Sequence, residues 1–322
     1  MAKVRKQPRR SARKSNVADA STRGRAAAAR VVQRRAAVRR KRRVSRAAPV
    51  RRRALTARAV EIPTRTQRAL AAPPATGLLV AEGDSWFDYP FNDVLSMLED
   101  EHGFEVESVA HKGDTVEDMA YSGGQFDDFT RLLEKLLRRG QVPDAILLSG
   151  GGNDIAGDEF AMLLNHAASG LPPLNDDVVK GVIDVRTRNA FVFLIAGLTE
   201  ISNQFLDRPI PILVHGYDHA IPDGRGVLGG FSLLPGPWLE PGFHRKGYPN
   251  LRANATTVAT LIDRFNEMLR QVTRAPGFAH VRFVDLRGTL SGGPDYKRDW
   301  ANELHPTERG FRAVAQKIAN AV

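Results

Sequence analysis

The sequence contains no cysteine among its 322 residues. This absence excludes disulfide bonds, thiol nucleophiles and zinc sites with cysteine ligands. Long apolar runs are also missing, and no stretch approaches the roughly 20 apolar residues that a membrane-spanning helix requires. A secretory signal is not indicated, because no apolar segment of the necessary length follows the basic N-terminal residues. These absences predict an intracellular, cytoplasmic protein.

Acidic residues are almost absent from the first 58 positions, which contain Asp19 and 22 Lys and Arg residues. This segment carries a formal charge of +21, so the remainder carries −10 and the overall +11 describes neither part. Its few apolar side chains cannot offset the entropy lost on ordering, so we expect a disordered basic arm over residues 1–58. Residues 59–76 are expected to form a linker, and residues 77–322 a globular domain.

The basic arm has three interpretations. It could bind nucleic acid or another polyanion electrostatically. Because Ala and Arg favour helices, it could become helical on such a partner. Its Arg-rich, acid-poor composition is also typical of transit peptides. The third interpretation is a solvated tail without a specific partner.

From residue 77 onward, signals for strands and helices alternate. Short apolar runs predict five strands, at residues 78–81, 104–109, 145–148, 210–214 and 281–284. Longer segments with apolar residues at helical spacing predict helices at 126–139, 189–206, 254–272 and 307–321. This alternation predicts a parallel sheet covered by helices on both faces. Right-handed crossovers then bring the strand-to-helix loops to one edge, where ligands bind in open α/β sheets.

Three of these loops, and the segment before the last helix, contain residues suited to acyl transfer. The first loop reads Gly-Asp-Ser at 83–85, the second His-Lys-Gly-Asp at 111–114, and the third Gly-Gly-Asn-Asp at 151–154. Asn-Glu-Leu-His at 302–305 precedes the closing helix. Acyl transfer needs a nucleophile, a base that takes its proton, and donors that hold the oxyanion. These four segments contain a candidate for each role.

In this combination the chain resembles the GDSL-type SGNH hydrolases, a family of serine esterases and acylhydrolases. The family's G-D-S motif is matched at 83–85, and the Gly of its second block is matched by Gly113. Its G-x-N-D motif is matched at 151–154, and the base of its last block is matched by His305. The resemblance covers the chain from Gly77 onward and leaves out the basic arm. It implies a flavodoxin-like three-layer α/β/α sandwich, and neither a cofactor nor a metal.

The resemblance also implies roles for individual residues. Ser85 takes the place of the nucleophile and His305 that of the base. The backbone N–H groups of Ser85 and Gly113, with the side-chain amide of Asn153, would hold the oxyanion. The implied activity is cleavage of a carboxylic ester through an acyl-enzyme. The alternative function is binding alone, on an inactive scaffold of this kind that the basic arm tethers to nucleic acid or another polyanion.

One position departs from the family pattern, because Asn302 stands three residues before His305 where the family usually has Asp. A carboxylate there orients the imidazole, and replacing the corresponding Asp of a serine protease costs about 10⁴ in turnover. The side chain or the backbone carbonyl of Asn302 could orient His305 instead. Glu303 is the best ionised substitute. Asp299 lies roughly 20 Å from the base in an extended chain, so it would require a fold-back.

Two further patterns are not taken as sites. Ala-Tyr-Ser-Gly-Gly at 120–124 is one residue short of the G-x-S-x-G nucleophile elbow and follows no predicted strand. His215, Asp218 and His219 at a strand end could bind a metal, but such residues more often line a cleft or hydrogen-bond to loop backbone. Residues 216–250 are rich in Gly and Pro and predict a long irregular excursion that could cover the cleft.

Overall fold

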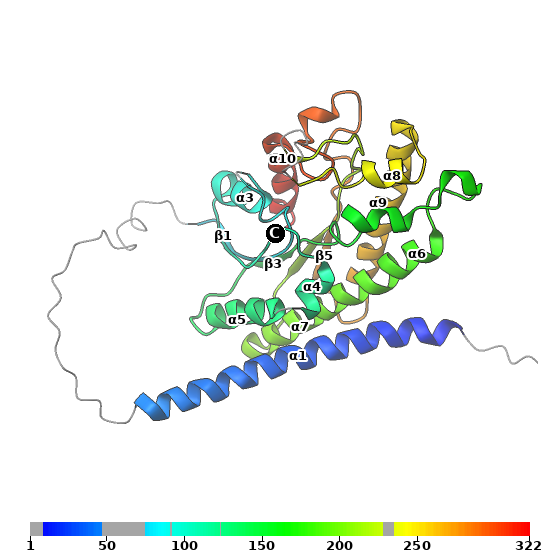
Figure 1. The fold of residues 1–322 in the computed structure, drawn as a ribbon. Helices are drawn as coiled ribbons and strands as arrows, with labels where there is room; N and C mark the ends of the chain where they lie inside the picture. The colour runs from blue at the N-terminus through cyan, green and yellow to red at the C-terminus, as the bar shows by residue number, and fades with distance from the viewer. Residues whose placement is uncertain (1–8, 47–74, 91, 123, 228–234) are drawn as a thin grey trace, which may run out of the picture.

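The computed structural model describes the backbone of residues 9–46, 75–90, 92–122, 124–227 and 235–322. A five-stranded parallel sheet lies at its centre (Figure 1). The strands are β1 (Gly77–Glu82), β2 (Phe104–Ser108), β3 (Ala145–Leu148), β4 (Ile212–His215) and β5 (Val281–Val284). Their order, β2-β1-β3-β4-β5, is that of flavodoxin-like folds. The prediction of a parallel sheet with this fold class is confirmed.

The central strands are short apolar runs that are buried on both faces, as a sheet covered by helices requires. β3 and β4 are buried along their whole length. β1 pairs with β2 on one side and with β3 on the other, where Glu82 lies opposite Leu148. The backbone N–H of Ser149 continues this ladder by donating to the carbonyl of Glu82. The loops that follow β1 and β3 therefore leave the sheet side by side.

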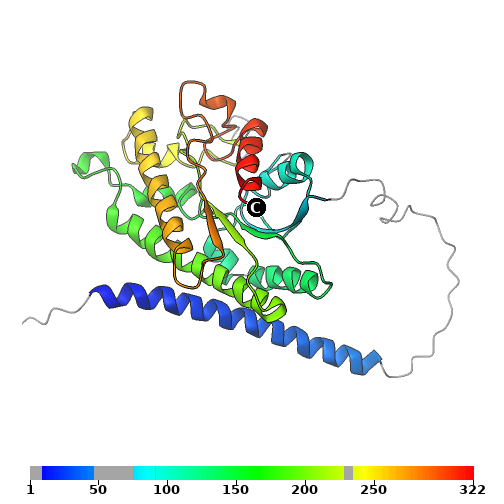
Figure 2. The same ribbon diagram turned by 180° about the vertical axis from the view of Figure 1, so that it is seen from behind.

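The direction of each crossover decides which face of the sheet a helix covers. The connection from β1 to β2 runs one way along the sheet, whereas the later connections run the other way, so right-handed crossovers put their helices on opposite faces. Accordingly, α3 (Val94–His102) packs beside α10 (Glu308–Ala319). The other face is covered by α5 (Gln125–Leu137), α7 (Arg188–Leu206) and α9 (Leu251–Thr273) (Figures 1 and 2).

Several short helices lie in the connections. They are α4 (Val116–Tyr121), α6 (Asp176–Gly181), α8 (Glu240–Arg245), a π-helical segment at Val182–Thr187, and 3₁₀ segments at Gly157–Leu163, Ala167–Ser169 and Tyr296–Arg298. α8 corrects the expectation of an irregular excursion over 216–250, and it begins at Glu240 with Pro in its first turn, where a missing N–H has no consequence. Within the described part of the chain, no helix is both long and apolar enough to cross a membrane.

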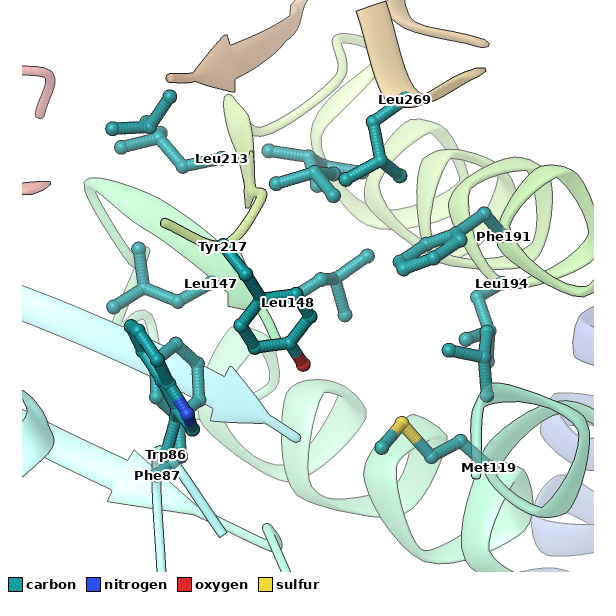
Figure 3. Close-up of a cluster of buried hydrophobic side chains, with 14 of the residues drawn as sticks. Trp86, Phe87, Met119, Leu147, Leu148, Phe191, Leu194, Leu213, Tyr217 and Leu269 are labelled. Atoms are coloured by element: carbon teal, nitrogen blue, oxygen red, sulfur yellow. The ribbon is translucent and has the colours of Figure 1, made fainter. Parts of the chain in front are cut away.

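The main core lies where the sheet meets α7 and α9. Figure 3 shows side chains gathered there from β3, β4, α7, α9 and the segments next to the sheet edge, among them Leu147, Leu148, Leu213, Phe191, Leu194, Leu269 and Tyr217. Trp86 and Phe87 belong to the same cluster and are each 3% exposed. Burying a side chain of this size contributes roughly 1.5–3 kcal/mol. The loop that carries Ser85 is therefore anchored by the two aromatic rings that follow it.

The basic N-terminal segment differs from the expected disordered arm. Arg9–Arg46 form one long helix, α1, which lies across α7 as an additional outer layer (Figures 1 and 2). Ala20, Gly24 and Ala28 share one face of α1 through their four-residue spacing, and all three are buried. A Cβ atom at Gly24 would collide with the backbone carbonyl of Phe193 in α7. Glycine at this position therefore permits a close approach of the two helices.

Two physical effects explain why α1 is ordered. The expectation of disorder rested on the low apolar content of the arm. A narrow face of small residues is nevertheless enough to hold α1 on the domain, because two helices that pack closely make many dispersion contacts. The second effect is electrostatic, because Arg35 and Arg39 of α1 pair with the fully buried side chain of Glu134 in α5, as does Arg138. Burial raises the pKa of Glu134, but the three guanidinium groups outweigh it and leave this pKa below its ordinary value. Residues 1–8 and 47–74 of the predicted arm and linker lie outside the described residues.

Candidate active site

Ser85 and His305 meet at the carboxyl edge of the sheet. Ser85 follows β1 by three residues, and His305 precedes α10 by three. The Ser85 Oγ atom lies 2.8 Å from Nε2 of His305. A hydroxyl and an imidazole at hydrogen-bond distance have the geometry of the nucleophile–base pair that covalent hydrolysis requires.

The side chain of Asn302 contacts the other nitrogen of the imidazole. Its Oδ1 atom lies 3.0 Å from Nδ1 of His305 and accepts hydrogen bonds from the backbone N–H groups of His305 (2.8 Å) and Leu304 (3.0 Å). An atom that accepts from two N–H groups must be the amide oxygen, so Nδ1 of His305 is the protonated nitrogen. This tautomer leaves the lone pair of Nε2 facing Ser85, as a general base requires.

Two aromatic rings enclose the imidazole. Tyr89 stacks on His305 with ring centroids 4.3 Å apart, and its hydroxyl accepts a hydrogen bond from Nδ2 of Asn302 (3.1 Å). Trp238 meets the imidazole edge-on at 5.4 Å. His305 is only 5% exposed, and this burial lowers its pKa to about 3. The neutral imidazole is therefore the form present at pH 7.

The two carboxylates considered in place of Asn302 have other partners. Glu303 is fully buried and accepts hydrogen bonds of 2.6–3.0 Å from four backbone N–H groups, at positions 224, 238, 239 and 240. Asp299 accepts from the Ser291 N–H (2.8 Å) and pairs with Arg309 (3.3 Å). Glu303 thus connects the excursion to the segment of His305, and its bond to the Trp238 N–H holds Trp238 beside His305.

Asp84 connects three loops at the sheet edge. Its Oδ1 atom accepts from the Trp86 N–H (3.0 Å) and the Ser149 hydroxyl (2.8 Å), and its Oδ2 atom accepts from the Tyr217 hydroxyl. The Tyr217 oxygen in turn accepts from the Gly152 N–H (3.2 Å). Burial raises the pKa of Tyr217 well above its usual value, so the hydroxyl keeps its proton and remains a donor to Asp84. These contacts make Asp84 a positioning residue for the loops after β1, β3 and β4.

Besides the backbone N–H of Ser85, the candidate oxyanion donors lie on the loops after β2 and β3. Gly113 has a φ of +90°, in the left-handed region that favours glycine. The Nδ2 atom of Asn153 donates to the backbone carbonyl of Asp114 at 2.9 Å. An amide nitrogen carries two hydrogens, so this bond orients Asn153 and leaves its second N–H for an oxyanion.

A chain of polar side chains that ends at the buried Glu82 supports the loop of Gly113. The Nε2 atom of Gln125 donates to Oε1 of Glu82 (3.0 Å) and to the carboxylate of Asp114. Glu82 is 1% exposed at the end of β1, and its burial raises its pKa to about 8. Burial likewise raises the pKa of Asp154 to about 7, and the Asp154 carboxylate accepts the N–H of Val116 at 2.9 Å. These acids hold backbone and side chains in place around the loop.

The contacts of the two patterns set aside on sequence grounds are with groups other than Ser85 and His305. Asp218 accepts hydrogen bonds from three backbone N–H groups, at positions 219, 288 and 290. His219 contacts Asp263 at the surface, and Nδ1 of His215 lies 2.7 Å from the carbonyl of Gly216. The residues that the structure describes include no group of three or more potential metal ligands. Ser122 is an exposed residue that caps the end of α4.

Some contacts at the site were not anticipated from the sequence. Tyr89 lies only four residues after Ser85, yet its partners are 213 and 216 positions further along the chain. The indole N–H of Trp86 donates to the carbonyl of Leu304 at 3.0 Å, which holds the loop of Ser85 against the segment of His305. Local patterning carries no signal for such pairings. The aromatic residues Trp86, Phe87 and Tyr89, close after Ser85, are the sequence feature that could have indicated these contacts.

A family model for GDSL-like lipases and acylhydrolases matches residues 77–313. The chain belongs to the GDSL-like Lipase/Acylhydrolase family. No curated protein matches the chain. Similar solved structures include a catalytic mutant of an acetylxylan esterase from Geobacillus stearothermophilus, which is 14% identical in sequence. The match covers 76% of this chain and 94% of that chain, with a TM-score of 0.37. An α/β hydrolase from the metagenome of Lake Arreo has 14% identity, coverages of 77% and 95%, and a TM-score of 0.40.

Proposed function

We propose that this protein is a serine hydrolase that cleaves a carboxylic ester through an acyl-enzyme on Ser85. Its family supports ester hydrolysis in general terms. The observation that carries the finer proposal is the alignment of three groups, with Ser85 Oγ 2.8 Å from Nε2 of His305 and Nδ1 of His305 3.0 Å from Asn302 Oδ1. A nucleophile, a base and an orienter in this order activate a hydroxyl for attack on a carbonyl.

The reaction would proceed in two stages. Ser85 Oγ attacks the acyl carbon while its proton passes to Nε2 of His305, and the carbonyl oxygen becomes an oxyanion. The N–H groups of Ser85 and Gly113 and the amide of Asn153 donate to that oxygen. Collapse of this intermediate releases the alcohol, which takes the proton from His305. Water, activated by the same imidazole, then attacks the acyl-enzyme and releases the acid.

Asn302 gives this mechanism one special property. The amide oxygen fixes the tautomer and orientation of His305, but it carries no full charge to stabilise the imidazolium that forms during attack. Two further backbone N–H groups share the same oxygen, so its position is well defined. We therefore expect an enzyme whose catalytic groups are correctly aligned but whose turnover is slower than with Asp at position 302.

Covalent labelling with a fluorophosphonate probe tests the proposal. The wild type should be labelled, and both Ser85→Ala and His305→Ala should lose labelling while keeping the circular dichroism spectrum of the wild type. Ser122→Ala and His219→Ala are matched controls, because each removes the same functional group away from the site. Labelling that persists in Ser85→Ala, or that is lost equally in Ser122→Ala, would refute the assignment of the nucleophile.

A further inference from the structure

A small cavity begins at the proposed nucleophile. Its volume is about 40 Å³, and Ser85 and Asn153 are among the residues that line it. The rest of its wall is mostly apolar, with Ile155 and Ala156 from the loop after β3 and Val258 and Leu261 from α9. An apolar recess beside a nucleophile and an oxyanion donor is suited to an apolar group attached to the reacting carbon.

The size of the cavity limits what it can hold. A cavity of about 10–15 Å³ already holds one water molecule, so a cavity of about 40 Å³ is small and suits a group of only a few heavy atoms. Its walls have little freedom to retreat, because Ile155, Val258 and Leu261 are at most 4% exposed and belong to the packed core. Enlarging a close-packed interior requires displacing neighbouring side chains.

A second, larger hollow lies beside Trp238. Trp238, which contacts His305, also lines a hollow of about 300 Å³ together with Pro237, Pro241 and Arg245. The base has to return its proton to the leaving alcohol, so the alcohol must lie on the side of His305. The small cavity borders Ser85 and Asn153, and His305 is not among its lining residues, so we assign this cavity to the acyl group.

We propose that the 40 Å³ cavity is the acyl-binding site and that it restricts the enzyme to short acyl esters, with two to four carbons in the acyl group. The proposal rests on the proposed function, since the acyl carbon must bond to Ser85. The alcohol portion is not subject to this limit.

Hydrolysis of p-nitrophenyl acetate, butyrate, hexanoate and octanoate tests the proposal, because these esters share one alcohol. In the wild type, kcat/KM should fall by at least about tenfold from butyrate to hexanoate and further to octanoate, since a misfitting methylene changes kcat/KM by about 10–200-fold. Leu261→Ala enlarges the cavity and should raise the hexanoate-to-acetate ratio at least about tenfold. Ala156→Leu fills the cavity and should lower the butyrate-to-acetate ratio.

Leu269→Ala is the matched control. It removes the same volume from the same helix, but Leu269 does not line the cavity. Its chain-length profile should match that of the wild type. If the wild type is labelled at Ser85 yet cleaves octanoate as fast as acetate, or if Leu269→Ala changes the profile as Leu261→Ala does, the acyl-site proposal is overturned and the serine mechanism stands. If the folded wild type is neither labelled nor able to cleave any of these esters, the serine mechanism and the acyl-site proposal are both overturned.

Discussion

Replacing Asn302 with Asp should convert the uncharged orienter into a charged one. The substitution is close to isosteric, and the three hydrogen bonds that Asn302 Oδ1 accepts can all be kept by a carboxylate oxygen. The second carboxylate oxygen replaces Nδ2, and the Tyr89 hydroxyl, which now accepts from that atom, can rotate to donate to it. We therefore expect Asn302→Asp to fold with the geometry of the wild type.

The magnitude follows from the distance between the new charge and the imidazolium. For two unit charges about 4 Å apart at an effective dielectric constant of about 20, the interaction is about 4 kcal/mol. One pKa unit corresponds to about 1.4 kcal/mol, so the pKa of His305 should rise by roughly three units. An anion favours the protonated imidazole, and the shift is therefore upward from the value of about 3 that burial imposes in the wild type. The same attraction stabilises the imidazolium of the transition state, which allows kcat to rise by up to about 10³.

The assay is the pH dependence of kcat/KM for p-nitrophenyl acetate. The base acts only when neutral, so the wild type should keep its activity as the pH falls well below 6, until the protein itself unfolds. Asn302→Asp should be faster at pH 8 and should lose activity as the pH falls through about 6. Asn165→Asp, which adds the same charge in the segment before α6, should leave the profile unchanged. An Asn302→Asp protein that folds but shows neither a faster rate nor a shifted acid limb would refute the role of His305 as a base oriented from position 302.

Three further predictions concern the oxyanion donor, the excursion and α1. Asn153→Ala should lower kcat by about 10²–10³ with little change in thermal stability, because it removes one oxyanion donor. Glu303→Ala leaves four backbone N–H groups without their buried acceptor and should lower the free energy of unfolding by at least about 3 kcal/mol, measured by urea denaturation. Gly24→Leu should detach α1 and destabilise the protein by about 1–3 kcal/mol, whereas Ala26→Leu on its exposed face should not. Equal protection of α1 from hydrogen exchange in both variants would contradict the packing described for Gly24.

The ordering of α1 also bears on the predicted polyanion binding of the basic arm. Arg34, Arg35 and Arg39 pair with acidic side chains of α5, so part of the positive charge of the arm is neutralised by intramolecular ion pairs. Binding of nucleic acid by the arm stays a prediction, and it should weaken steeply as the salt concentration rises.

Much of the fold could be predicted because its signals are local. A buried strand is a short apolar run and a covering helix has apolar residues at helical spacing, so the five strands and the long helices from α5 onward were visible in the sequence. The handedness of crossovers then determined that the loops of Ser85, Gly113 and Asn153 share one edge. The resemblance to the SGNH hydrolases then assigned the candidate nucleophile, base and oxyanion donors among these residues and marked Asn302 as a departure.

Only the tertiary structure decided what each polar group contacts. Asn302, Glu303 and Asp299 lie within four positions of one another, yet the first faces His305, the second binds the backbone of the excursion, and the third binds Ser291 and Arg309. The order of α1 likewise depends on Glu134, about 100 residues away, and on the carbonyl of Phe193. A buried charge or a close helix crossing is stable only with partners distant in the sequence, and neither periodicity nor composition records where those partners lie.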